Sequence, residues 1–230
     1  MRRAVDLFEF ETGSARSPLV EQVWRTRSVP EDTFIAVAAS HWEMVVTRQD
    51  GRAELTVLGP ATRATTAGIP EDAEFLGIHF SVGTFMPVLP PGTVVDRGMT
   101  LSPSTRSTVW LDGYRIELPG RDDVDSFVAA LVRRDLLVTD PVVANAVGGR
   151  VDDLSVRSVE RRVLRATGLT RGGIRQIRRA ERAVELLRQG LAPIDVALAA
   201  GYSDQPHLTR SLRRFAGQTP AQIASAAVAG

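Results

Sequence analysis

Hydrophobic and polar residues alternate along much of the first half of the chain, as they do in half-buried strands. Residues 42–48 and 52–58 both alternate, and residues 49–51 lie between them. Because the Asp50-Gly51 pair adopts the positive φ of a tight turn, this segment predicts a β-hairpin. Further strands are expected at residues 75–82 and, with a weaker pattern, at residues 20–25. Three prolines (Pro87, Pro90, Pro91) predict a loop from Met86 to Gly92.

From Asp123 on, the spacing of apolar residues becomes helical. One face of a predicted helix is expected to hold the apolar residues Val124, Phe127, Val128, Leu131 and Val132. A short helix is expected from Pro141 to Val147, because proline suits a first turn and Gly148-Gly149 ends the pattern. Later helices are expected at residues 155–167, 172–189, 193–200 and 204–215.

Charge divides the chain more sharply than its net charge of +1 indicates. Residues 1–154 hold 15 Arg against 22 Asp and Glu, and residues 155–230 hold 13 Arg against 5, which gives −7 and +8. A basic end on an acidic body is typical of a nucleic-acid-binding protein. Every basic residue other than histidine is arginine, whose planar guanidinium forms paired hydrogen bonds with phosphate and guanine.

The last predicted helices form two helix-turn-helix units. In the second, residues 193–200 form a compact apolar helix, Gly201 marks the turn, and the next helix is amphipathic. Its apolar face holds Leu208, Leu212 and Phe215, and its opposite face holds Pro206, Arg210 and Arg213. The helix after Ser155 repeats this pattern, with Val156, Val159 and Val163 facing inward and Arg157, Arg161 and Arg165 facing outward. A connecting helix with Ile177, Ala180, Val184 and Leu187 inside would set the two units in successive major grooves.

The segment from Leu154 to about Ala224 resembles the AraC/XylS family of transcription activators. The resemblance depends on the string 200–210 (AGYSDQPHLTR), followed by Phe215, Gly217, Thr219 and Pro220. It implies base contacts from Arg157, Glu160, Arg161, Gln205, Pro206, His207 and Arg210, and phosphate contacts from Thr209, Arg213 and Arg214. Arg165 completes the predicted DNA-binding set.

Two departures from the family pattern concern the DNA-reading units. Pro206 replaces the usual serine, and Gly148 and Gly149 stand where the family has leucine and alanine, so the helix before Ser155 is expected to be poorly formed. The N-terminal part is similar, through residues 41–48, 58–60 and 77–85, to a sensor-like domain found in actinobacterial members of the family.

Other chemistry has less support in the sequence. The absence of cysteine excludes disulfides, thiolate metal sites and a cysteine nucleophile, and no catalytic motif suggests an enzyme. His41 and His79 are expected to be isolated structural histidines, so neither a metal nor another cofactor is expected. Trp24, Trp42 and Trp110 are read first as core residues. The alternative is a small-molecule pocket lined by Trp42, His79 and Trp110.

We therefore expect an α+β protein. Residues 1–120 would form a β-rich, cupin-like sensor or dimerisation domain, residues 121–152 a helical connector that could supply homodimer contacts, and residues 153–230 the double helix-turn-helix domain. The expected partners are double-stranded DNA, RNA polymerase and a small-molecule effector, without a membrane. With no signal-like N-terminus and no long apolar stretch, the expected location is the bacterial cytoplasm. The alternative is a nucleoid-type interaction module with little sequence specificity.

Overall fold

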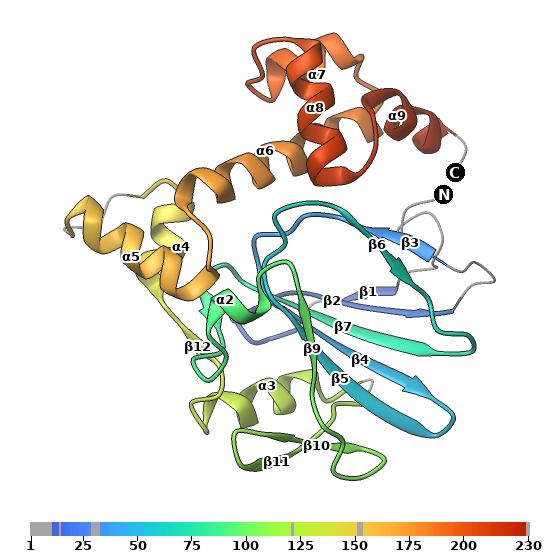
Figure 1. The fold of residues 1–230 in the computed structure, drawn as a ribbon, viewed down its shortest axis with the longest axis vertical. Helices are drawn as coiled ribbons and strands as arrows, with labels where there is room; N and C mark the ends of the chain where they lie inside the picture. The colour runs from blue at the N-terminus through green and yellow to red at the C-terminus, as the bar shows by residue number, and fades with distance from the viewer. Residues whose placement is uncertain (1–10, 14, 29–32, 121, 151–153, 229–230) are drawn as a thin grey trace.

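The computed structural model describes residues 11–13, 15–28, 33–120, 122–150 and 154–228. A β-rich N-terminal part and a helical C-terminal part confirm the α+β class (Figure 1). The expectation about a signal peptide and the boundary between residues 152 and 153 lie outside the described residues.

The N-terminal part is built on a six-stranded antiparallel sheet in the order β1-β2-β7-β4-β5-β9. Three two-stranded sheets, β3–β6, β8–β12 and β10–β11, accompany it. The strands are β1 (Glu11–Gly13), β2 (Val20–Arg27), β3 (Thr33–Ala36), β4 (Glu43–Gln49), β5 (Arg52–Leu58), β6 (Thr65–Gly68), β7 (Glu74–Phe80), β8 (Thr84–Phe85), β9 (Gly98–Thr100), β10 (Thr108–Leu111), β11 (Tyr114–Glu117) and β12 (Val138–Thr139). The predicted hairpin is β4–β5, and its turn residues Asp50 and Gly51 have φ values of 50° and 69°.

Helices follow the sheet and end the chain. They are α2 (Pro91–Val94), α3 (Val124–Val132), α4 (Pro141–Val147), α5 (Val156–Thr167), α6 (Arg171–Arg188), α7 (Pro193–Ala199), α8 (Gln205–Ala216) and α9 (Pro220–Val228). The loop predicted for residues 86–92 is wrong at its end, because Pro91 begins α2. A proline fits there since the first turn of a helix needs no amide donor.

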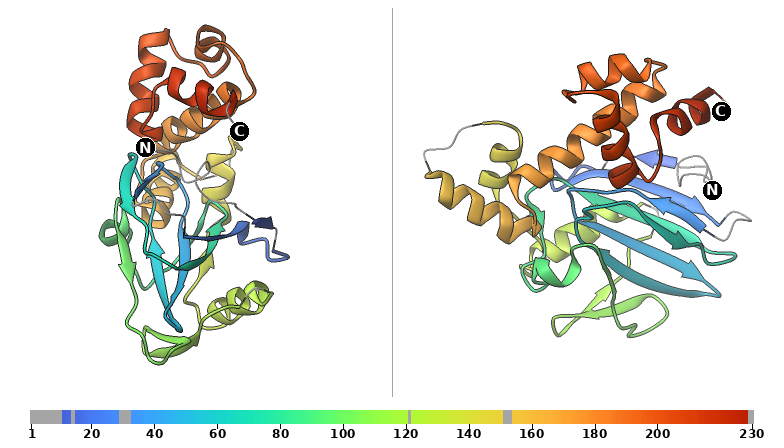
Figure 2. Two further views of the ribbon diagram at one scale, coloured as in Figure 1. Left: turned by 90° about the vertical axis from the view of Figure 1, so that its right-hand side faces the viewer. Right: turned by 45° about the horizontal axis from the view of Figure 1, so that its top comes forward.

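The long helix α6 lies along the boundary between the sheet and the other C-terminal helices, as both figures show (Figures 1 and 2). Its apolar residues Ile174, Ile177, Ala180, Ala183, Val184 and Leu187 are buried. Buried side chains of the two parts join in one hydrophobic core. The sheet therefore holds the helical part in a defined place.

Candidate nucleic-acid interface

Helix α5 presents arginines outward from a buried apolar face. Ser155 caps it by accepting a hydrogen bond from the Ser158 amide at 3.3 Å, and Gly168 ends it at φ 69°. Val159, Val163, Ala166 and Thr167 are buried, whereas Arg157, Arg161 and Arg165 are exposed. Glu160 is partly exposed, and its Oε1 lies 3.7 Å from Nη1 of Arg171 on α6.

The expectation that Val156 faces inward is wrong, because its side chain is 71% exposed. Val156 is the first residue of α5 and lies beyond the reach of the core that covers Val159. Leu164 is also 52% exposed. Apolar side chains on a DNA-reading helix can contact the methyl group of thymine.

Helix α8 repeats this arrangement. Oδ1 of Asp204 accepts a hydrogen bond from the His207 amide at 2.6 Å, and this bond holds the pKa of Asp204 below its ordinary value. Leu208, Leu212 and Phe215 are buried, as predicted. The exposed residues of the predicted set are Gln205, Pro206, Arg210, Arg213 and Arg214. In the described part of the chain, no ion pair joins these arginines to a carboxylate.

Two predicted contacts on α8 are engaged locally. The His207 ring packs edge-on against Tyr202 at 5.1 Å, and its Nδ1 lies 3.1 Å from Oγ of Ser203. The Thr209 hydroxyl donates to the Gln205 carbonyl of its own helix at 2.9 Å. Both side chains stay partly exposed. Each side chain therefore already makes a local contact in addition to any contact that it would make with DNA.

The helix before α5 is formed, although it is short. Helix α4 packs against α5 and α6, and Oδ2 of Asp140, its N-cap residue, lies 2.9 Å from Nη1 of Arg162. The connection between α4 and α5 runs from residue 148 to residue 155, whereas that between α7 and α8 runs from 200 to 204. The two glycines lengthen the first turn and leave α4 intact.

The three residues predicted to line a ligand pocket lie in different surroundings. Trp42 is 1% exposed, and its Nε1 donates to the Ala166 carbonyl at 2.8 Å, so it is a core residue that contacts α5. Trp110 is 50% exposed in the separate β10–β11 hairpin. His79 lies on β7, in the six-stranded sheet. Trp42 therefore belongs to the core, and Trp110 lies in a different sheet from His79. A small-molecule pocket lined by these residues stays a prediction.

His79 belongs to a polar cluster that the sequence did not reveal. Its Nε2 lies 2.8 Å from Oε1 of Glu43, which also accepts a hydrogen bond from Nε1 of Trp24 at 2.8 Å. The His41 and His79 rings lie 4.6 Å apart, so these histidines are not isolated as expected. The β4–β7 register places Glu43 opposite His79, and Gly77 leaves room for the Trp24 indole. Among the described residues, no group of three or more His, Asp or Glu could hold a metal ion.

Opposing effects set the charges in this cluster. Burial alone would lower the pKa of His79, but the hydrogen bond and charge of Glu43 raise it above its ordinary value. Burial would raise the pKa of Glu43, but the same hydrogen bond and the charge of His79 hold it below its ordinary value. The pair therefore favours the charged form of both groups.

Comparison with known proteins agrees with this geometry. The sequence of residues 152–226 matches the family described as "Helix-turn-helix domain". Relatives from two strains of Mycobacterium tuberculosis, each named HTH-type transcriptional regulator VirS, are 39% identical over 106 residues. The aligned segment is 46% of this chain and 30% of the relative, so the chain spans less than a third of the length of these relatives.

Solved structures of ToxT from Vibrio cholerae O395 also align along the chain. One aligns over 96% of this chain and 99% of its own, with a TM-score of 0.45 and 8% identity. Another, bound to (E)-4-(8-methylnaphthalen-1-yl)but-3-enoic acid, covers 95% and 99%, with a TM-score of 0.45 and 9% identity.

Two helices that follow turns and present arginines outward define a helix-turn-helix domain of the DNA-binding class. Residues 152–226 match this helix-turn-helix family, and the relatives that align with the chain are named transcriptional regulators. In the described part of the chain, no helix is both long enough and apolar enough to cross a bilayer.

Proposed function

We propose that the chain is a sequence-specific DNA-binding transcription regulator of the bacterial cytoplasm. The observation that supports this function best is the pair of capped helices α5 and α8, each with a buried apolar face and outward arginines. Such helices fit two major grooves on one side of a duplex. The regulator would work as an activator that contacts RNA polymerase, and the helices near residues 123–148 would supply homodimer contacts. We assign it no catalytic role.

The division of roles within the interface follows the sequence prediction. Arg157, Glu160, Arg161, Gln205, Pro206, His207 and Arg210 would contact bases, and Thr209, Arg213 and Arg214 would contact phosphates. Arg165 would contact DNA without an assigned target. Arg210 lies one turn into α8, near the end that enters the groove, whereas Arg213 and Arg214 lie in its last turn. This placement supports base contacts by Arg210 and DNA-backbone contacts by Arg213 and Arg214.

Contacts between the two parts support control by the N-terminal part. The Ala38 amide donates to the Phe215 carbonyl and the Ala64 amide to the Arg214 carbonyl, each at 2.8 Å, at the C-terminal end of α8. Trp42 makes the equivalent contact with the end of α5. Connecting segments next to β3, β4 and β6 thereby hold both reading helices. A small-molecule effector or a partner that changes the N-terminal part would change their placement.

Arg210→Ala is expected to cost about 1–3 kcal/mol of binding free energy and to relax the preference at one base position, because it removes a paired contact with a base edge. Arg213→Ala should instead weaken binding to all sequences alike. The measurement is fluorescence anisotropy with duplexes that the wild-type protein selects from a random pool. If both variants lose affinity equally for selected and unselected duplexes, the nucleoid-type alternative with little specificity is favoured.

Arg157→Ala combined with Arg161→Ala tests the first unit separately. We expect the base preference of the selected duplex to be lost in one half, because both arginines are exposed on α5 and would enter its groove. Sequencing of the duplexes that this variant selects measures the effect. If selection returns the wild-type sequence in both halves, α5 does not read bases. The matched control is Arg133→Ala combined with Arg134→Ala, which removes the same charge beyond α3.

A further inference from the structure

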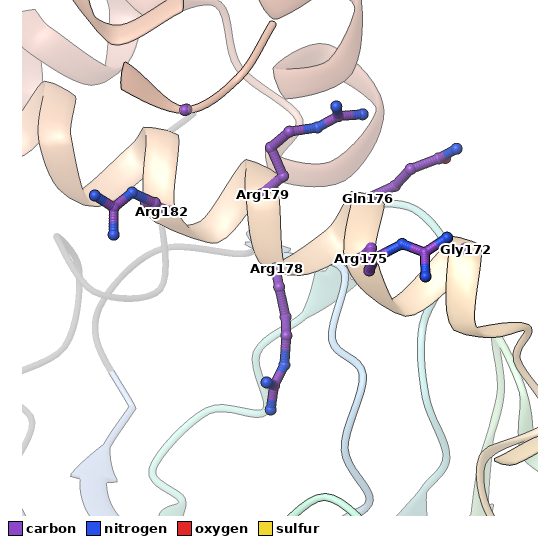
Figure 3. A pocket seen from close by; sticks show the side chains of 7 residues that line it. Gly172, Arg175, Gln176, Arg178, Arg179 and Arg182 are labelled. Carbon is purple, nitrogen blue, oxygen red and sulfur yellow. The ribbon is translucent and has the colours of Figure 1, made fainter. Parts of the chain in front are cut away.

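The connecting helix α6 carries a row of arginines that the proposed reading helices do not include. Arg171, Arg175, Arg179 and Arg182 follow one another at intervals of four, four and three residues, so they share one side of the helix. A groove on α6 is lined by Gly172, Arg175, Gln176, Arg178, Arg179, Arg182 and Ala200 (Figure 3). In Figure 3, Arg178 points from α6 toward the strands, away from Arg179. We call Arg171, Arg175, Arg179 and Arg182 the arginine row.

The arginine row joins the two reading units. At its beginning, Arg171 lies 3.7 Å from Glu160 of α5. Further along, Nη1 of Arg179 donates to the Gly201 carbonyl at 3.2 Å, and its guanidinium lies 4.8 Å from the centre of the Tyr202 ring. Both Gly201 and Tyr202 belong to the turn before α8. The row is therefore continuous with the start of one reading helix and with the outer side of the other.

Among the described residues, Arg171 is the one member of the arginine row that pairs with a carboxylate. Arg175 and Arg182 are exposed, and in the described part of the chain neither forms an ion pair. The two carboxylates of α6 interact with groups outside the row, since Glu181 is attracted by the charge of Arg178 and Glu185 accepts a hydrogen bond from Gln189. Cations one turn apart repel each other. Several arginines on one exposed side of α6 therefore indicate an anionic binding partner.

We infer that the arginine row binds the phosphodiester backbone of the DNA segment that lies between the two major-groove contacts. The inference rests on the proposed function. From Arg171 to Arg182 the helix rises about 17 Å, about half of the roughly 34 Å between successive major grooves on one side of a duplex. The planar guanidinium pairs two hydrogen bonds with one phosphate, and backbone contacts of this kind fix position without reading sequence. The connector thus binds DNA as well as spacing the two units.

The test is the salt dependence of DNA binding by the full chain. Arg175→Gln combined with Arg182→Gln removes two guanidiniums that have no ion pair within the described chain. The plot of log K against log salt concentration is expected to become shallower by about 1.8, because each phosphate contact contributes about 0.9 to the slope. Anisotropy is measured with a fluorescent duplex of arbitrary sequence, about three helical turns long, over a series of NaCl concentrations.

Two further variants separate a local contact from a change in net charge or in folding. Arg52→Gln combined with Arg115→Gln removes the same charge from exposed positions of the N-terminal part and should leave the slope unchanged. Arg175→Lys combined with Arg182→Lys should keep the slope, because lysine also binds phosphate as a point charge. The inference is overturned if the glutamine variant keeps the wild-type salt slope, or if the Arg52 and Arg115 control shows the same decrease in slope. Either result leaves the proposed function standing. Failure of the wild-type chain to bind any duplex at low salt overturns the proposed function with it.

Discussion

Trp42→Ala is expected to lower the free energy of unfolding by about 3–5 kcal/mol, the usual cost of deleting a large buried aromatic side chain. Trp42 is 1% exposed and lies among the largest fully buried side chains. The substitution also leaves the buried Ala166 carbonyl without the indole N–H that donates to it at 2.8 Å. Denaturant unfolding followed by far-ultraviolet circular dichroism measures the change.

Trp110→Ala is the matched control, because it deletes the same side chain at a site that is 50% exposed. Its cost should stay within about 1 kcal/mol, since little apolar surface leaves the core there. Trp42→Phe separates packing from the hydrogen bond: it keeps most of the buried ring and loses the contact with Ala166. Amides near the end of α5 should then exchange faster with solvent, while the sheet stays protected. Equal costs for Trp42→Ala and Trp110→Ala would contradict the role of Trp42 as the link between the two parts.

Local sequence signals predicted the strands β2, β4, β5 and β7 and the helices from α3 to α8. The β4–β5 hairpin follows from alternation and from Asp50-Gly51, and α5 follows from Ser155 and Gly168, because each of these signals acts through its own neighbours. The capped helix α8 follows in the same way from Asp204. For the same reason the exposed arginines of α5 and α8 were predictable, since helical period alone places them opposite the apolar face.

Pairing between distant segments could not be predicted in this way. Alternation in β4 and β7 indicates two strands but does not state that Glu43 lies opposite His79, so the polar cluster was missed. The same limit applies to Trp42, whose indole bonds to residue 166 across the boundary between the two parts. Residues that share one helix are different, because the spacing of the arginine row of α6 can be counted in the sequence, although the sequence predicted no role for it. Only its contacts with Glu160 and Gly201 show that the arginine row links the two reading units.

The His41 ring resists protonation in the folded state. Burial holds its pKa at about 4, below the ordinary 6.5, and the positive charges of His79 and Arg178 act in the same direction against the opposing charge of Glu43. Between about pH 4 and pH 6.5, His41 is protonated in the unfolded chain but neutral in the folded chain. The free energy of unfolding should therefore decrease as the pH falls from about 6.5, with the loss complete below about 4.

Titration of His79 changes the free energy of unfolding with pH in the opposite direction. The contribution of His41 is therefore obtained by comparing the wild-type protein with a variant that lacks His41. The raised pKa of His79 gives a stabilisation that is fully present below 6.5 and is lost as the pH rises through the folded-state value. Between pH 7 and pH 4, the wild-type protein should lose about 2–3 kcal/mol more than His41→Gln, which cannot titrate at that position.

The two histidines can also be followed directly. In proton NMR spectra recorded against pH, and assigned with His41→Gln and His79→Gln, the His41 ring signal should stay in its neutral position until the pH approaches about 4. The His79 signal should still report a protonated ring above pH 6.5, because Glu43 stabilises its charge. If His41 titrates near 6.5, or if His41→Gln leaves the pH profile of unfolding unchanged, the ring is not buried against His79 and Arg178 in solution.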